Sequence, residues 1–461
     1  MKRMWHTGRT VEQTSQSQQR QSNMSFARKS VPPVLLLLGF AGGWWLRPSA
    51  PSPTPLPAAV APDASPEPAS PEPPVRLAPL GNEPDWTIFD AYQQTITRPE
   101  FERLLTTVFT TGEAWKNFTA LDDHEAIIAP GAVESGLRFH LRFASADREK
   151  IPPRHWRTTA ELPPAPADRP LEELRVAIDP GHIGGVWAKM EERWFVVGNG
   201  RPVCEGDLTL MVARLLKPRL EAMGAIVSLV RNDSEPLTPL RPESLLEQAK
   251  AESGPDDVRK RAERLFYRTA EIRARAELVN RSIQPDLVLC LHFNAEPWGD
   301  PNSPTLVDRS HFHLLLNGGY TDDELALADQ RFEMLRKLLQ RTHTQEAAIG
   351  TEMAAAFYQV TGLPPYSYPP GTRNARTIEG NPFLWARNLL ANRLYDCPVI
   401  FLEPYVMNSQ NDYARIQAGD YDGQREVGGK MQISIFREYA DAVGLGLADY
   451  YRRHRPASPS D

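Results

Sequence analysis

Short apolar runs alternate with amphipathic segments along the second half of the chain. Four runs are mostly apolar, as is typical of strands buried on both faces of a sheet: 174–179, 225–231, 285–295 and 397–406. Segments 207–224 and 270–282 space their apolar residues as helices do. Strands that alternate with helices predict an α/β layer sandwich, with a mostly parallel central sheet flanked by helices.

The N-terminal part of the chain has a different pattern. Arg28 and Lys29 precede an apolar run at 31–46, which is typical of a secretory signal or a membrane anchor within residues 1–46. Residues 47–79 are rich in proline, which fixes φ and removes backbone donors, so they predict an extended linker. We therefore expect an exported protein, held at the inner membrane if the apolar run is an anchor.

Residues 80–150 predict a small α+β domain whose role the sequence does not indicate. Helical spacing is found for Phe101, Leu104, Leu105 and Phe109, and strand alternation for Leu137, Phe139, Leu141 and Phe143. Residues 151–170 form a second proline-rich linker. The sandwich domain then spans 171–455, with a polar, proline-containing insertion at about 298–395.

Charge and cysteine content narrow the class of protein. The formal net charge is −6, which provides no basic face for nucleic acid. The three cysteines, Cys204, Cys290 and Cys397, are too few and too scattered for a disulfide framework. Cys290 and Cys397 lie in or beside apolar runs, so we expect small buried thiols there.

Four polar residues stand where an open α/β sheet places its ligand-binding groups. His182, His292 and Glu403 follow or close apolar strands, and Glu205 precedes a helix. Two imidazoles and a carboxylate are a catalytic zinc set that leaves a position for water, and a further carboxylate can serve as general base. Each residue alone has a plain structural explanation, whereas the four together favour a metal site.

Four ordered sequence blocks resemble the zinc-dependent N-acetylmuramoyl-L-alanine amidases of type 3, over about residues 171–451. The blocks are VAIDPGHIGG, CEGDLTLMVARLLKPRLEAMGAIVSLVRND, RAELVNRSIQPDLVLCLHFNA and PVIFLEPYVMN. Ile183 departs from the family's Gly-His-Gly-Gly, and the stretches 241–268 and 298–396 are longer than the family leads us to expect. The resemblance implies hydrolysis of the amide bond between N-acetylmuramic acid and L-alanine in peptidoglycan.

Carried over residue by residue, the resemblance implies that zinc is the cofactor. Its ligands would be His182, Glu205 and His292, with Glu403 as the catalytic carboxylate. Asp179 or Asn294 could orient a ligand imidazole from outside the ligand set, or could cap a strand. Arg275 is expected to be structural rather than catalytic. Within the insertion, candidates for contact with the anionic stem peptide are His311, His313, Arg373, Asn374 and Arg376.

Two other functions remain open from the sequence. One is another zinc peptidase or carboxypeptidase of the cell wall, since its reaction chemistry needs the same residues. The other is a catalytically inactive wall-binding regulator, which should hold little zinc. The expected partners are peptidoglycan, the membrane through the N-terminal segment, and regulators of cell division or of the wall, with no nucleic acid.

Overall fold

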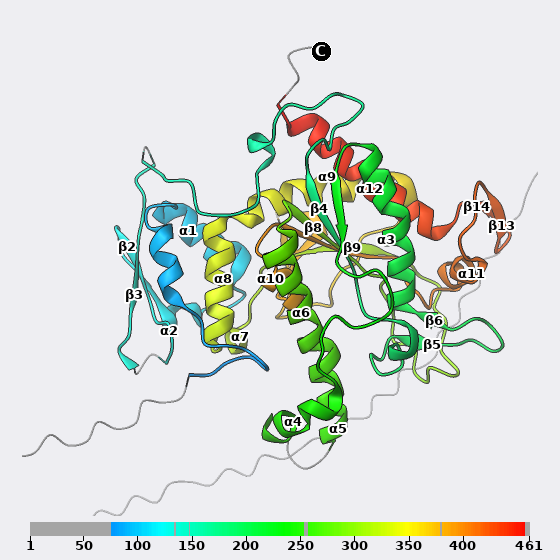
Figure 1. The fold of residues 1–461 in the computed structure, drawn as a ribbon, viewed down its shortest axis with the longest axis horizontal. Coiled ribbons are helices and arrows are strands. Elements are labelled where there is room, and N and C mark those ends of the chain that lie inside the picture. The colour runs from blue at the N-terminus through cyan, green and yellow to red at the C-terminus, as the bar shows by residue number, and fades with distance from the viewer. Residues whose placement is uncertain (1–74, 133–134, 147, 253–256, 379, 457–461) are drawn as a thin grey trace, which may run out of the picture. The chain divides into compact units, whose positions relative to one another are not determined.

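The computed structural model describes residues 75–132, 135–146, 148–252, 257–378 and 380–456, which form one compact unit (Figure 1). The signal or anchor and nearly all of the first linker lie outside the described residues, so both stay predictions. No helix in the described part is both long and apolar enough to cross a membrane.

A seven-stranded sheet forms the centre of this unit, in the order β10-β11-β9-β12-β8-β4-β7. The predicted runs become β4 (Arg175–Pro180), β7 (Ile226–Leu229), β8 (Leu287–Leu291) and β12 (Val399–Pro404), which are mutually parallel. β9 (Phe312–Leu316) pairs antiparallel with β12. β11 (Asn381–Ala386) runs parallel to β9, and β10 (Arg376–Ile378) antiparallel to β11. The predicted α/β sandwich with a mostly parallel sheet is confirmed.

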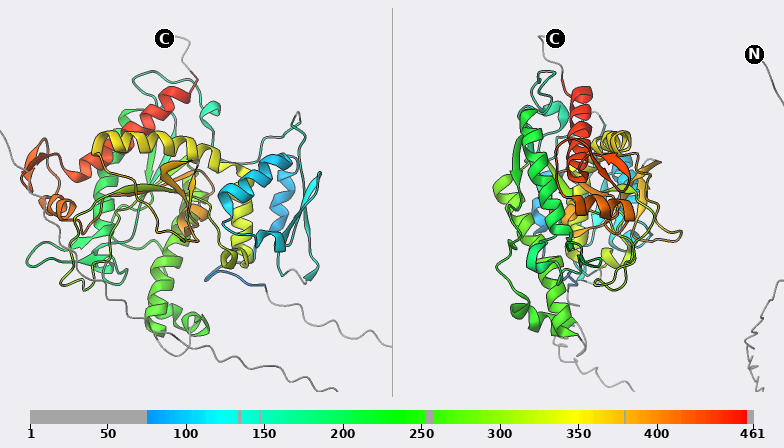
Figure 2. Two further views of the ribbon diagram at one scale, coloured as in Figure 1. Left: turned by 180° about the vertical axis from the view of Figure 1, so that it is seen from behind. Right: turned by 90° about the vertical axis from the view of Figure 1, so that its right-hand side faces the viewer.

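Helices cover both faces of the sheet because successive strand residues point to opposite sides. Leu289 belongs to the core under α3 (Glu205–Ala222), α9 (Thr342–Thr361) and α12 (Ile435–His454), and α12 packs on both α3 and α9 (Figure 2). The next residue, Cys290, packs with Ala276 of α6 (Glu271–Leu278) and Ala391 of α10 (Leu390–Leu394). All three cysteines are buried and free, as expected for Cys290 and Cys397.

The segment expected to be an insertion supplies part of the sheet itself. β9, β10 and β11 all lie within 298–395, as do α7 (Asp322–Leu325), α8 (Ala328–Gln340) and α9. Strand β9 contacts β12 directly, with His313 opposite Glu403. Part of this segment therefore belongs to the sheet and lies next to the predicted site. Whether it is an insertion stays a prediction.

A small antiparallel sheet precedes the large one, as predicted. It consists of β1 (Thr119–Leu121), β2 (Glu125–Ile128) and β3 (Phe139–Arg142), next to α1 (Arg98–Leu104) and α2 (Trp115–Phe118). Its neighbour Phe89 packs on Phe332 of α8, with ring centroids 4.8 Å apart. Whether residues 80–150 make a domain of their own stays a prediction.

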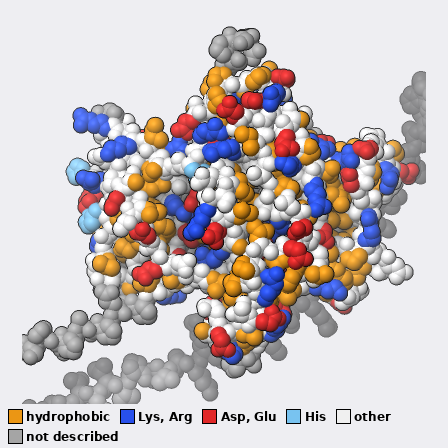
Figure 3. Space-filling model, viewed as in Figure 1, with side chains coloured by type: hydrophobic (Ala, Val, Ile, Leu, Met, Phe, Trp, Pro, Cys, Tyr) orange, Lys and Arg blue, Asp and Glu red, His pale blue; other side chains and the backbone are white. Residues whose placement is uncertain are grey.

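The remaining elements are short. They are β5 (Trp194–Phe195), β6 (Val203–Cys204), α4 (Leu246–Glu252), α5 (Val258–Leu265), α11 (Gln410–Ala418), β13 (Arg425–Val427) and β14 (Lys430–Gln432). On the face of the molecule shown in Figure 3, basic and acidic side chains are intermixed.

Candidate metal centre

The parallel strands bring the predicted residues to one edge of the sheet. In the register of the central strands, Pro180 of β4, Leu291 of β8 and Leu402 of β12 lie side by side. His182, His292 and Glu403 follow these positions by one or two residues. Glu205 is the first residue of α3 and reaches the same edge.

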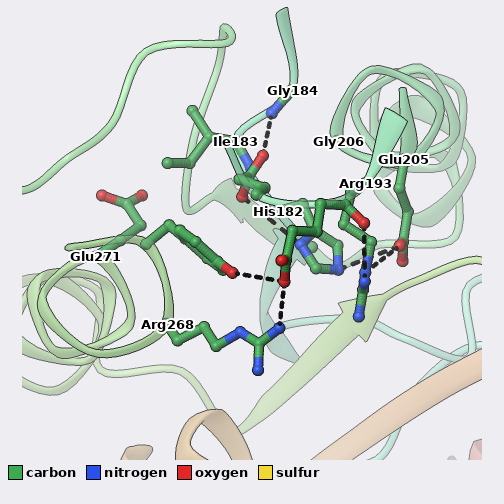
Figure 4. A network of polar contacts seen from close by, with 12 residues as sticks. His182, Ile183, Gly184, Arg193, Glu205, Gly206, Arg268 and Glu271 are labelled. Atoms are coloured by element: carbon green, nitrogen blue, oxygen red, sulfur yellow. Dashed lines mark hydrogen bonds and ion pairs between the residues drawn. The ribbon is translucent and has the colours of Figure 1, made fainter. Parts of the chain in front are cut away.

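His182, Glu205 and His292 form a compact group that could hold a metal ion. One ligand atom from each residue lies within 4.8 Å of the others. Glu205 is central, because its Oε2 lies 3.2 Å from Nε2 of His182 and its Oε1 lies 3.1 Å from Nδ1 of His292. Arg193 Nε also lies 3.2 Å from Glu205 Oε2 (Figure 4). The structure thus brings together the three residues that the sequence singled out.

The backbone around His182 is held in an uncommon conformation. His182 has φ of +61°, in the left-handed region that few residues other than glycine adopt. Arg275 donates a hydrogen bond of 2.8 Å to the carbonyl oxygen of His182, and the Glu191 carboxylate accepts from the amides of Ile183 and Gly184. These contacts fix the loop and so direct the imidazole toward Glu205.

A second carboxylate lies behind the His182 ring. Glu191 is buried, and its Oε1 lies 3.6 Å from Nδ1 of His182, so that Nε2 is the nitrogen left to face Glu205. A carboxylate behind an imidazole fixes the tautomer and raises the basicity of the metal-facing nitrogen. Glu191 lies in an irregular loop without periodicity, so no sequence pattern indicates its role.

The loop that carries His182 passes close to the His292 ring, which explains why residue 181 is a glycine. A Cβ on Gly181 would lie 2.2 Å from Cε1 of the His292 ring. Any side chain there would push the imidazole away from Glu205. Phe401 holds the other face of this ring by stacking, with centroids 4.2 Å apart.

The charges around His182, Glu205 and His292 favour a positive charge at the centre of this group. Burial opposes a charged His182, but Glu205 and Glu191 outweigh it and raise the pKa of His182 to about 9. Burial likewise opposes a charged Glu205, yet both imidazoles hold the pKa of that carboxyl well below its usual range. Burial lowers the pKa of His292, against the opposing effect of Glu205.

Glu403 faces the same centre from β12. It lines a cavity of about 540 Å³ together with His182 and Glu205. Burial, followed by the charge of Glu205, raises the pKa of Glu403 to about 8, against the opposing effect of His182 and nearby arginines. A carboxyl group that binds a proton near neutral pH is suited to general acid–base work.

The other predicted residues have different surroundings. Asp179 accepts from Arg275 Nη1 at 2.9 Å and from the Tyr395 hydroxyl at 2.5 Å, and Asn294 Oδ1 accepts from a neighbouring amide. Among the described residues, neither of the two hydrogen bonds to an imidazole of the cluster. Arg373 is exposed and lines neither cavity next to the cluster.

Arg275 and the two insertion histidines are buried. Arg275 binds Asp179 and Glu271 and supports the His182 loop. His311 Nε2 lies 3.3 Å from the Glu296 carboxylate, which itself lines the 540 Å³ cavity. Arg193 and Arg387 also line this cavity, and the sequence analysis named neither.

Comparison with known proteins adds a likeness of structure. No family model and no curated protein matches this sequence. Solved structures of N-acetylmuramoyl-L-alanine amidases match about 60% of the chain. The amidase Ami1 of Mycobacterium smegmatis is 16% identical over 61% of this chain and 98% of its own, with a TM-score of 0.33. AmiC2 of Nostoc punctiforme is 16% identical over 60% of this chain and 96% of its own, with a TM-score of 0.32.

Proposed function

We propose that this protein is a zinc-dependent amidase that cuts the bond between N-acetylmuramic acid and L-alanine in peptidoglycan. The observation that carries the proposal is the buried group of His182, Glu205 and His292, with Glu403 facing the same cavity. The four sequence blocks support the choice of bond, because they resemble those of this amidase family.

The donor set fits zinc. Two imidazole nitrogens and one carboxylate oxygen are the ligands of many catalytic zinc sites, with one position left open for water. Glu191 behind His182 supplies the outer carboxylate that such a ligand imidazole usually has. The negative charges of Glu205 and Glu191, which raise the pKa of His182 against the effect of burial, are also charges that a bound cation would balance.

In the proposed reaction, zinc would act as a Lewis acid that polarises the amide carbonyl and acidifies water. Glu403 accepts a proton from the attacking water and returns it to the nitrogen of the leaving alanine. Burial and the charge of Glu205 raise the pKa of Glu403, whereas His182, Arg193 and Arg387 lower it. Arg275 and Glu191 keep the His182 loop in place through both steps.

Digestion of purified peptidoglycan with the zinc-loaded full chain tests the proposal. We expect release of stem peptides that carry a free amine on L-alanine. Glu403→Gln should lower this release by about 10²- to 10⁴-fold, the usual contribution of a general base. The matched variant Glu426→Gln, on an exposed residue of β13, should keep full release. An unchanged release by Glu403→Gln would refute the role of Glu403.

The same digest separates the two other functions. A wall peptidase would expose new amines inside the stem peptide rather than on L-alanine. An inactive regulator would release nothing, and metal analysis would find well under one zinc per chain. One zinc per chain together with free L-alanine amines is the result that the amidase proposal requires.

The place of action belongs to the proposal as well. We propose that the chain is exported and works on the wall side of the membrane, with peptidoglycan as its main partner. Fractionation of cells tests this, because a cytoplasmic pool alone would contradict it. One amidase of similar structure, CwlD of Clostridioides difficile, was solved in complex with the GerS lipoprotein, at 12% identity to this chain. A regulatory partner of this chain stays a prediction.

A further inference from the structure

Two cavities meet at the metal cluster. The first, of about 540 Å³, includes Trp298 and the acidic residues Glu192 and Glu296 in its lining. The second, of about 400 Å³, lies between α6 and the segment that follows β11. His182, Arg193, Arg387 and Glu403 line both. A substrate that is cut at the cluster therefore extends into both cavities, with one part on each side of the reacting bond.

The second cavity combines an apolar wall with arginines. Ile272 of α6, Leu389 and Phe401 contribute to the apolar wall. Four arginines also line it, and three of them bind carboxylates of the chain itself. Arg193 lies 3.2 Å from Glu205, Arg268 lies 3.2 Å from Glu192, and Arg275 lies 2.9 Å from Asp179.

The fourth arginine, Arg387, has a different set of contacts. Its Nη1 donates to the Tyr368 hydroxyl at 3.2 Å, and its guanidinium lies 5.7 Å from the centre of that ring. Among the described residues it forms no ion pair. Its charge is therefore available to a ligand in a cavity whose other arginines are engaged.

Tyr368 holds Arg387 in position. The Tyr368 ring packs edge-on against Trp385, with centroids 4.9 Å apart, and its hydroxyl lies 3.4 Å from His313 Nε2. His313 is itself buried opposite Glu403 in the sheet. A guanidinium that is fixed in this way loses little freedom when it binds a carboxylate in a two-point contact.

We infer that the second cavity binds the stem peptide and that Arg387 binds one of its carboxylates. This inference rests on the proposed function. The apolar wall takes the aliphatic parts of the peptide, and Arg387 takes the negative charge. Two arginines and four carboxylates line the first cavity, whereas four arginines and four carboxylates line the second. The second cavity is therefore the better place for an anionic peptide, and the glycan lies in the first.

Calorimetric binding of a stem peptide tests the inference. The probes are a synthetic peptide with L-alanine first and an acidic second residue, and the same peptide with that carboxylate converted to the neutral amide. The zinc-loaded full chain should bind the carboxylate form about 10- to 100-fold more tightly, as a charge-assisted hydrogen bond predicts. Arg387→Gln should bind both forms alike, at the affinity that the wild type has for the amide form.

Two further variants keep the test specific. Arg387→Lys retains the charge without the planar fork and should keep part of the preference. Arg452→Gln, which removes an exposed charge on α12, should keep all of it. Equal binding of both peptides by the wild type would overturn the inference, as would an undiminished preference in Arg387→Gln.

The peptidoglycan digest distinguishes this failure from failure of the proposed function. If the zinc-loaded chain releases free L-alanine amines but shows no preference between the peptides, only the Arg387 inference is wrong. If it shows the preference but never cuts peptidoglycan, the amidase proposal is wrong and the peptide site remains.

Discussion

The environment of Glu403 in the candidate centre can be tested by measuring protein stability, independently of catalysis. Its pKa is about 8 in the folded metal-free protein, against 4.5 for an ordinary glutamate. The folded state thus holds this proton more tightly than the unfolded state does. The resulting contribution to stability is complete below pH 4.5 and is lost as the pH rises through about 8. Above that pH the folded protein must contain an unfavourable buried charge.

The magnitude follows from the two pKa values. A change from 4.5 to about 8 corresponds to at most about 5 kcal/mol at high pH, at about 1.4 kcal/mol for each tenfold change in the ionisation constant. Glutamine cannot ionise, so Glu403→Gln should avoid this loss. We expect the metal-free variant to resemble the wild type near pH 5 and to be more stable by a few kcal/mol near pH 9.

Urea unfolding of metal-free wild type and variant between pH 5 and 9 measures the difference. Glu191→Gln is the matched control with the opposite sign. Despite burial, contacts with His182 and two backbone amides lower the pKa of Glu191, so its ionised form stabilises the fold above about pH 4.5. Saturating zinc should shrink the Glu403 effect, because a nearby cation stabilises the carboxylate. A pH-independent effect of Glu403→Gln would refute the reasoning.

Three other predictions concern the same region. Zinc must displace the proton that His182 holds with a pKa of about 9, so the apparent zinc affinity should rise about tenfold per pH unit from pH 6 to 9 in a chelator competition. Arg275→Met should cost about 3–5 kcal/mol in urea unfolding, because it leaves two buried carboxylates unpaired; a cost below about 1 kcal/mol would contradict this. Ile183→Ala should cost about 2–4 kcal/mol and weaken zinc binding, whereas Val186→Ala, on the exposed part of the same loop, should do neither.

The sequence predicts those parts of the fold in which one local pattern decides the structure. The run at 285–291 is apolar throughout its centre, and a strand buried on both faces is the structure that suits it. β10 and β11 could not be predicted in this way. Asn381 and Pro382 interrupt the apolar pattern of β11, and β10 has only 3 residues. β11 pairs along the edge of β9, and β10 pairs along the edge of β11, so both strands depend on tertiary contacts.

In the candidate centre, too, some residues could be predicted from local sequence patterns and others could not. Three of its residues follow parallel strands or open a helix, so their meeting could be predicted from the order of elements and the family blocks. Glu191 and Arg387 come from irregular segments, and nothing in their spacing indicates which way they face. Their place depends on backbone amides of the His182 loop and on the Tyr368 hydroxyl, which only the folded chain brings near.

Ile183 and the stretch at 241–268, where the sequence departs from the amidase motifs that it resembles, are physically linked. The Ile183 side chain lies next to His182 and needs an apolar partner. The longer stretch at 241–268 provides one, because Leu245, Leu265 and Phe266 form a small core with the fully buried Ile183. In this chain α4 and α5 therefore anchor the loop that carries a metal-ligand candidate. Trp187 of the same loop also packs on Phe266, with ring centroids 5.3 Å apart, but a glycine at 183 would leave a void in this core. The isoleucine and the stretch at 241–268 therefore stabilise each other.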